Sequence, residues 1–187
     1  MSKGYMPSVI NRFNIYLRKN RLFGHTGEVE LPAVKFLTET LEGAGVGGTM
    51  DIAVTGLTEN MEISIPFTCI SQDMARMLDP TEPLDLTLRG AVQAMDQGSG
   101  RMTFQDLKVV IRGFTKEYTP GTLKAGAKMS GSIAANMTYY KIEYDGDTFL
   151  EIDKLNDVCI INGNDVLAEV RPHGRPHTGQ TGDLTPA

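Results

Sequence analysis

Histidine is the side chain most often used for acid–base chemistry at neutral pH, and this chain of 187 residues has three. His25 lies in the glycine-containing loop Phe23–Gly27, where a lone histidine is usually a surface residue rather than a catalytic base. His173 and His177 are four residues apart, as in a helical metal site, but the glycine and proline between them oppose a helix. We therefore predict no catalytic residue and no bound metal.

The two cysteines form no motif. Cys69 and Cys159 are far apart, and neither belongs to a Cys-x-x-Cys pair. Isolated cysteines of this kind favour neither a disulfide framework nor a zinc site. We expect both to act as small apolar side chains.

A glycine run, Gly43–Gly48, formally matches the G-x-G-x-x-G pattern of dinucleotide-binding loops. Such a loop needs a helix immediately after it, because the helix N-terminus holds the pyrophosphate. The following residues, Thr49–Thr55, alternate as a strand instead, so the suitable spacing of Glu62 for a ribose contact carries little weight. A nucleotide-binding β domain stays the alternative. We predict no cofactor and a turn that joins two strands.

Acidic side chains gather in one segment of a chain whose net charge is −5. From Phe36 to Ala75 the sequence has no lysine, arginine or histidine. We define the acidic set as Glu39, Glu42, Asp51, Glu59 and Glu62. The plainer interpretation is a solvated surface, and the sharper one is a surface that repels nucleic acid. The overall negative charge disfavours tight duplex binding.

Basic side chains gather later in the chain. We define the basic set as Lys108, Arg112 and Lys116, which share one parity of a predicted strand, and Lys124 and Lys128 in the loop after it. This set is either a solvated surface or a face that meets the acidic face of a neighbouring subunit and sets the register.

The elements that position these residues are predicted to be strands, because apolar and polar residues alternate with a period of two. The shorter strands are Val9–Leu17, Val34–Thr40, Thr49–Thr55, Met61–Ile65 and Leu84–Arg89. In the first, Val9, Phe13, Ile15 and Leu17 are expected on one face. A single helix, Gln72–Leu78, is predicted after Ser71 as N-cap. The fold class is therefore mainly β, a sandwich or barrel with one short α-helix.

Two later strands are unusually long. Arg101–Thr119 and Met129–Tyr144 are predicted to form a hairpin across the loop Pro120–Lys128. A change of apolar parity predicts a bulge near Gln105-Asp106, and Gly113 permits a bend. Either the hairpin projects and neighbouring subunits complete its sheet, or bulges divide it into short strands of one sandwich.

The end of the sequence reads as a last hairpin and a tail. Val158–Ile161 and Val166–Val170 flank Asn162-Gly163, which is typical of a two-residue turn. The proline- and glycine-rich residues after Val170 lack periodicity. We predict a β domain over residues 1–170 and a flexible tail over 171–187. No stretch has the length of a membrane span or the apolar core of a signal peptide, so we expect no membrane anchor.

Several short segments stand out in order along the chain. They are Leu31-Pro32, Leu41–Gly45, Val109–Gly113 with Lys116-Glu117, Tyr139–Gly146, Leu150–Asp153 and Ile161–Asp165. Together they resemble the major tail tube protein family of P2-like contractile-tailed phages and related tailocins. The resemblance runs from about Phe13 to Asp165 and contains no catalytic motif. The two Arg-Pro-His copies after Val170 depart from it.

The resemblance implies a structural virion protein and not an enzyme. It implies a β-sandwich-like subunit in hexameric rings, which stack into the hollow inner tube of a contractile tail. The implied partners are copies of the chain, the sheath, the baseplate or initiator, the terminator, the tape-measure protein, and DNA that passes without tight binding. The implied place is the virion tail, after assembly in the host cytoplasm.

Within such a tube, we expect the acidic set to face the lumen and the basic set to lie between subunits. The alternative within this class is the tube of a DNA-free tailocin or of a secretion-type injection system.

Overall fold

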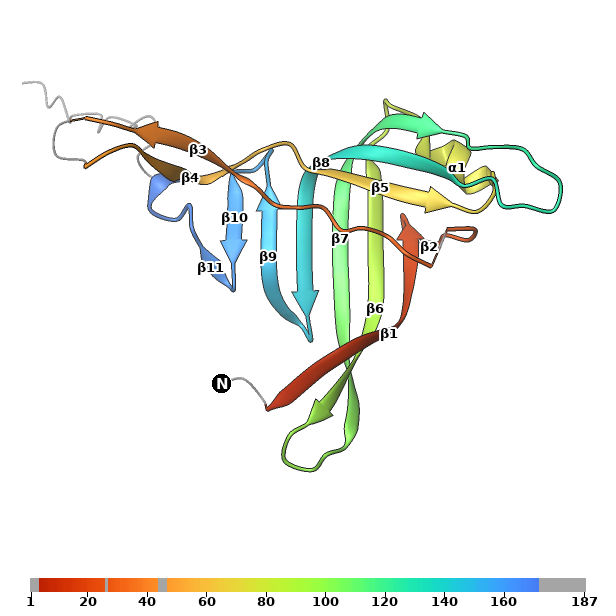
Figure 1. Cartoon of the computed structure of the whole chain (residues 1–187), viewed down its shortest axis with the longest axis horizontal. Helices are drawn as coiled ribbons and strands as arrows, with labels where there is room; N and C mark the ends of the chain where they lie inside the picture. The colour runs from red at the N-terminus through yellow and green to blue at the C-terminus, as the bar shows by residue number, and fades with distance from the viewer. Residues whose placement is uncertain (1–3, 26, 44–46, 172–187) are drawn as a thin grey trace, which may run out of the picture.

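The computed structural model describes residues 4–25, 27–43 and 47–171, which form mainly antiparallel strands (Figure 1). Nine strands make one sheet in the order β11-β10-β9-β8-β7-β6-β1-β2, with β5 joined to β8 off this path. Two more strands, β3 and β4, form a separate sheet and, among the described strands, pair only with each other. This confirms the predicted mainly β fold with one short helix.

The elements have the following bounds. They are β1 (Tyr5–Leu17), β2 (Asn20–Arg21), β3 (Phe36–Leu41), β4 (Met50–Thr58), β5 (Glu62–Phe67), α1 (Gln72–Met77), β6 (Leu84–Asp96), β7 (Met102–Thr119), β8 (Gly131–Tyr144), β9 (Asp147–Asp153), β10 (Val158–Ile161) and β11 (Asn164–Asp165).

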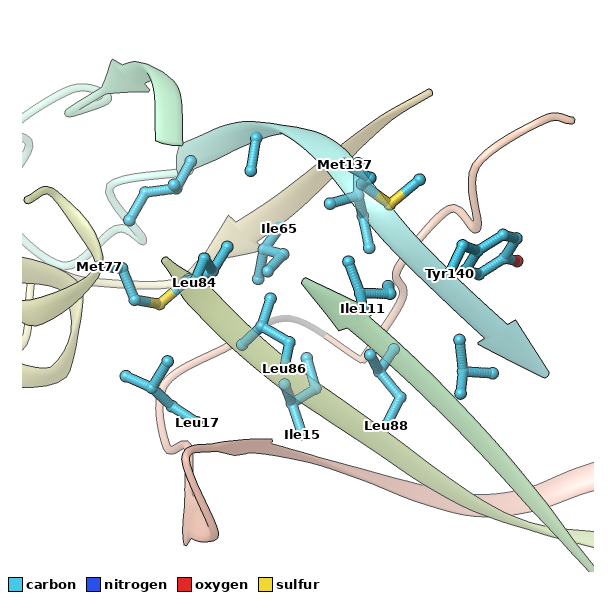
Figure 2. Packing of buried hydrophobic residues seen from close by; sticks show 14 of the residues in the cluster. Ile15, Leu17, Ile65, Met77, Leu84, Leu86, Leu88, Ile111, Met137 and Tyr140 are labelled. Atoms are coloured by element: carbon cyan, nitrogen blue, oxygen red, sulfur yellow. The ribbon is translucent and has the colours of Figure 1, made fainter. Parts of the chain in front are cut away.

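The hydrophobic core lies on one side of the large sheet, which we call the inner face. Leu86 of β6 and Ile111 of β7 are fully buried there, since alternate residues of a strand point to the same side. Ile65 of β5 and Met77 of α1 pack against them from above the sheet (Figure 2). The opposite side, called the outer face, carries charged and polar side chains along β6–β9.

Strand β8 changes its partner half-way along. Its first part, up to Asn136, pairs with β5, and its second part, from Tyr139, pairs with β9. A register shift against β7 between Arg112 and Gly113 marks the change. A Cβ atom on Gly113 would lie 1.9 Å from the carbonyl oxygen of Asn136, so only glycine fits. The predicted irregularity at Gly113 is confirmed.

Strand β7 is continuous over 18 residues and β8 over 14, so the division into several short strands is wrong. The bulge predicted near Gln105-Asp106 is also wrong, because β6 and β7 pair from Met102 to Gly113 without a register shift. The parity changes because Met102 and Phe104 lie on the outer face, whereas Leu107 lies on the inner face. Both faces of this strand are therefore partly apolar.

Two register shifts occur instead in β1, between Pro7 and Val9 and between Ile10 and Arg12. An extra residue reverses the alternation of side chains along a strand. Val9 consequently lies on the outer face and is 55% exposed, whereas Ile15 is fully buried. The prediction that Val9 shares the face of Ile15 is therefore wrong.

The single helix is close to its prediction. Helix α1 begins after Ser71, ends at Met77 with Leu78 as C-cap, and buries Met74 and Met77. Ser71 occupies the N-cap, but its hydroxyl makes no capping hydrogen bond. No helix in the described part of the chain is long and apolar enough to cross a membrane.

The last hairpin turns at Asn162 and Gly163, whose φ angles of 51° and 76° fit a two-residue turn as predicted. Its second strand is shorter than expected, and the predicted strand Val166–Val170 is wrong. The Asp165 carboxylate accepts a hydrogen bond from the backbone N–H of Leu167 and pairs with Arg171, which turns the chain out of the sheet. Residues 172–187, most of the predicted tail, lie outside the described residues.

Candidate wall and assembly surfaces

The outer face of β6–β9 carries a group of charged side chains that are linked by ion pairs. Cross-strand partners point to the same side of a sheet, so the pairs Arg112–Tyr139, Lys108–Glu143 and Lys141–Glu151 share this face. We call these residues, with Asp85, the charged ladder. It crosses four neighbouring strands.

The contacts in the lower part of the charged ladder are short. The Lys108 ammonium lies 2.7 Å from the Glu143 carboxylate. Lys141 lies between two carboxylates, 3.0 Å from Glu143 and 3.1 Å from Glu151. The Tyr139 hydroxyl donates a hydrogen bond of 2.9 Å to Glu151. Each ammonium group is thus held by at least one carboxylate of its own chain.

The upper part of the charged ladder is looser. The Arg112 guanidinium lies 5.0 Å from the centroid of the Tyr139 ring, within range of a cation–π contact. Its Nε is 3.7 Å from the Asp85 carboxylate. The Arg112 and Asp85 side chains are more than two-fifths exposed, so we assign their ion pair little stabilising free energy.

Proton affinities follow the same contacts. Hydrogen bonds from Lys108 and Lys141 lower the pKa of Glu143, and the bond to Glu143 raises the pKa of Lys141. Burial, and then the bond to Glu151, raises the pKa of Tyr139 to about 12. At neutral pH Glu143 and Lys141 are therefore both charged and paired with each other.

Sequence reasoning found part of this ladder and missed the rest. Lys108 and Arg112 belong to the predicted basic set, but Lys141, Glu143 and Glu151 were not singled out. The available signal was the tight turn at Asp145-Gly146, which brings β8 and β9 side by side. The bulge between them, which fixes the partners, leaves no clear sequence pattern.

The remaining residues of the basic set lie elsewhere. Lys116 forms a 2.7 Å ion pair with Glu62, which belongs to the acidic set, and this contact raises the pKa of Lys116. Lys124 and Lys128 lie exposed in the loop between β7 and β8 and form no ion pair within the described residues. The expectation that the basic set lies between subunits stays a prediction.

The acidic set is divided by the register of the β3–β4 hairpin. Glu39 pairs with Ile52, whereas Asp51 pairs with Thr40, so the two carboxylates lie on opposite faces. Glu42 and Glu59 follow the ends of β3 and β4. The lumen-facing position of the whole set stays a prediction. Because Glu39 and Asp51 point in opposite directions from the hairpin, they cannot both face the same wall of a lumen.

The large sheet has edges that are open to further pairing. Strand β1 pairs with β6 along one side but with β2 only at Tyr16 and Leu17 on the other. The opposite end of the sheet finishes at the two-residue strand β11. Unpaired edge groups are ready partners for another chain, and proteins usually cover or pair them.

The other candidate sites from the sequence offer less support for a function. The described residues contain no group of three metal-ligating side chains, and His173 and His177 lie outside them. Cys69 is exposed and Cys159 is buried, and both are free thiols. The glycine run is only partly described, and strand β4 follows it as predicted.

Comparison with known families decides between these interpretations. The model of the family "Phage tail tube protein FII" matches residues 7–174. The chain belongs to this family. It is therefore a tail tube protein, and the resemblance inferred from its sequence is confirmed.

Two curated relatives agree with this membership. The chain is 28% identical over 171 residues to the tail tube protein of Escherichia phage P2, an alignment that covers 89% of this chain and 96% of the relative. It is 26% identical over 166 residues to the major tail tube protein of Serratia phage KSP20, with 88% and 93% covered.

Solved structures share the fold. A sheath/tube terminator of the extracellular contractile injection system PVC aligns with a TM-score of 0.53 and 12% identity, over 73% of this chain and 96% of that one. A chain of the sheath–tube complex of the same system aligns with a TM-score of 0.51 and 12% identity, over 73% and 91%. At this identity the likeness concerns the fold alone.

Proposed function

We propose that this tail tube protein polymerises as stacked hexameric rings into the inner tube of a contractile phage tail, through which the genome passes into the host. The observation that carries the proposal is the open edge of β1. Over most of its 13 residues this strand pairs with no strand of the described chain on one side. A neighbouring copy that pairs with it would continue the sheet from subunit to subunit.

A sheet that continues around a ring has two surfaces, one that faces the central channel and one that faces away from it. The inner face is filled by the core and covered by β5 and α1 (Figure 2). The part of the outer face of β6–β9 that carries the charged ladder would then form the surface of the lumen. Its cations would face DNA, but each is engaged with a carboxylate or a ring of its own chain.

This arrangement supports passage of DNA without tight binding. Affinity for a duplex comes largely from cations that are free to neutralise phosphates. A lysine held between two carboxylates, as Lys141 is, offers little to a phosphate. The acidic set, where it faces the lumen, would add repulsion of the same sign.

The same role requires further partners. A tube of stacked rings needs an initiator or baseplate at one end and a terminator at the other, a tape-measure protein inside during assembly, and a sheath outside. We propose these partners for this chain. We also propose that it assembles in the host cytoplasm, becomes part of the virion tail and has no enzymatic activity.

Electron microscopy tests the proposal. We expect the chain, co-expressed with the initiator of its own tail, to form six-fold rings and tubes in which β1 pairs with a neighbouring copy. A chain that stays monomeric with its initiator present would overturn the tube. A tube whose lumen is lined by α1 and β5 would overturn the assignment of the wall.

A further inference from the structure

The β3–β4 hairpin has one apolar face, which no other part of the described chain covers. Residues of one parity in β3 and their cross-strand partners in β4 point to the same side. The apolar side chains on that side are Leu37, Leu41, Met50 and Ile52, each between 41% and 47% exposed. We call this surface the hairpin face. The opposite side carries Thr38, Thr40 and Asp51.

This hairpin stands alone. Its strands form a separate two-stranded sheet, and Figure 1 shows it extending away from the large sheet. An isolated two-stranded hairpin is at best marginally stable in water, and an apolar side normally packs on something. The hairpin face therefore requires a partner surface.

A second hairpin of the same kind is a poor partner. Glu39 lies among the apolar residues of the hairpin face, and no cation occurs between Phe36 and Ala75. Two such faces in contact would bring carboxylates together without a counter-charge, which opposes binding. The partner must be apolar and carry a cation.

The same chain has such a surface at the far end of the long strands. The row Met6–Met95–Met102 and the row Val9–Gln93–Phe104 lie on the outer face near the turn between β6 and β7. Met6, Val9, Met102 and Phe104 are between 48% and 60% exposed. We call these four residues the tip patch.

The charges beside the two surfaces are complementary. Arg12 follows Val9 on the outer face, and Arg101 precedes Met102. Neither arginine forms an ion pair within the described residues, and neither do Glu39 and Glu42 of the hairpin. In Figure 1 the hairpin and the tip of β6–β7 project from different ends of the molecule, so one chain does not join its own two surfaces.

We infer that the hairpin face of one copy covers the tip patch of another copy, with Glu39 beside Arg12. The inference deepens the proposed function and rests on it. The contact is heterologous, because two different surfaces meet, and it repeats from copy to copy. It stabilises the hairpin and removes two exposed apolar surfaces from water at once.

Cross-linking of assembled tubes tests the geometry. The variant Ile52→Cys/Phe104→Cys, in a Cys69→Ser background, carries one thiol on each surface. A short bismaleimide should join successive copies into a ladder of covalent multimers. The matched control Thr40→Cys/Phe104→Cys places the first thiol on the opposite side of the hairpin and should give none.

A charge exchange tests the contact independently. Glu39→Arg and Arg12→Glu should each reduce the yield of sedimented tubes severalfold, and the double variant should restore most of it. Tubes that form normally with either single variant, or a ladder from the Thr40 control alone, would overturn the inference while the tube stands. Absence of tubes from the unsubstituted chain would overturn the proposed function and the inference with it.

Discussion

Removal of two carboxylates from the charged ladder should turn the proposed wall into a surface that holds DNA. The double variant Glu143→Gln/Glu151→Gln keeps the shape of both side chains and changes the net charge from −5 to −3. Lys108 loses its carboxylate partner and Lys141 loses both of its own. Two ammonium groups per copy become available to phosphates.

The size of the effect follows from counterion release. Each phosphate contact adds about 0.9 to the slope of log K against log salt, so two contacts add roughly 1.8. Raising the salt from 50 to 200 mM should then lower the DNA affinity of the ladder variant by roughly twelvefold more than it lowers that of the unsubstituted chain. Fluorescence anisotropy of a labelled short duplex, titrated with assembled tubes, measures both the affinity and the slope.

The control keeps the same net charge. Glu30→Gln/Glu59→Gln also changes −5 to −3, but neither glutamate forms an ion pair within the described residues. Equal DNA binding by both double variants would refute the masking of cations and leave net charge as the cause. No gain in affinity by the ladder variant, with its fold intact by circular dichroism, would refute the reasoning as well.

Three further predictions concern the fold and its titration. Gly113→Ala should lower the free energy of unfolding by about 3 kcal/mol, as overpacking does, because the new Cβ meets the carbonyl of Asn136. In the control Gly27→Ala the new Cβ has open space. Equal melting temperatures of the two variants would contradict this prediction. The pKa of Glu143 is lowered in the fold, so its carboxylate adds stability that is present above the unfolded pKa and is lost as the pH falls through the folded pKa. The variant Glu143→Gln lacks this contribution. Its urea midpoints should therefore vary less with pH across the acid range than those of the unsubstituted chain. With its pKa raised to about 12, Tyr139 should stay protonated near pH 11, and Tyr139→Phe should remove one late step from the alkaline absorbance titration.

The strands were predictable because their pattern is local. Alternation along Leu84–Arg89 and the turn at Asn162-Gly163 need only neighbouring residues to be recognised, and both occur in the structure. The helix after Ser71 was predictable for the same reason. Local signals of this kind give an element's type more reliably than its partners.

The errors came from features that depend on a partner strand. The parity change in β7 looks like a bulge in one strand, but it marks the point where the apolar residues change from the outer face, at Met102 and Phe104, to the inner face, at Leu107. The true bulge lies in β1, and it moves Val9 to that face as well. One sequence cannot assign an irregularity to either of two strands that have not yet been paired.

The structure separates two ways in which a wall can fail to hold DNA. In the proposed tube the acidic set would act at a distance, and its repulsion would weaken as salt shortens the Debye length. The charged ladder acts by contact, because Lys108 and Lys141 already hold carboxylates at 2.7 to 3.1 Å, and added salt does little to free them. Adhesion is strongest at low ionic strength, because free cations bind phosphates most tightly there, and high salt weakens attraction and repulsion alike. The contact pairs keep Lys108 and Lys141 engaged in this low-salt range, where unpaired cations would hold DNA most strongly. This is the physical reason to propose the ladder, rather than the hairpin carboxylates alone, for the surface that DNA passes.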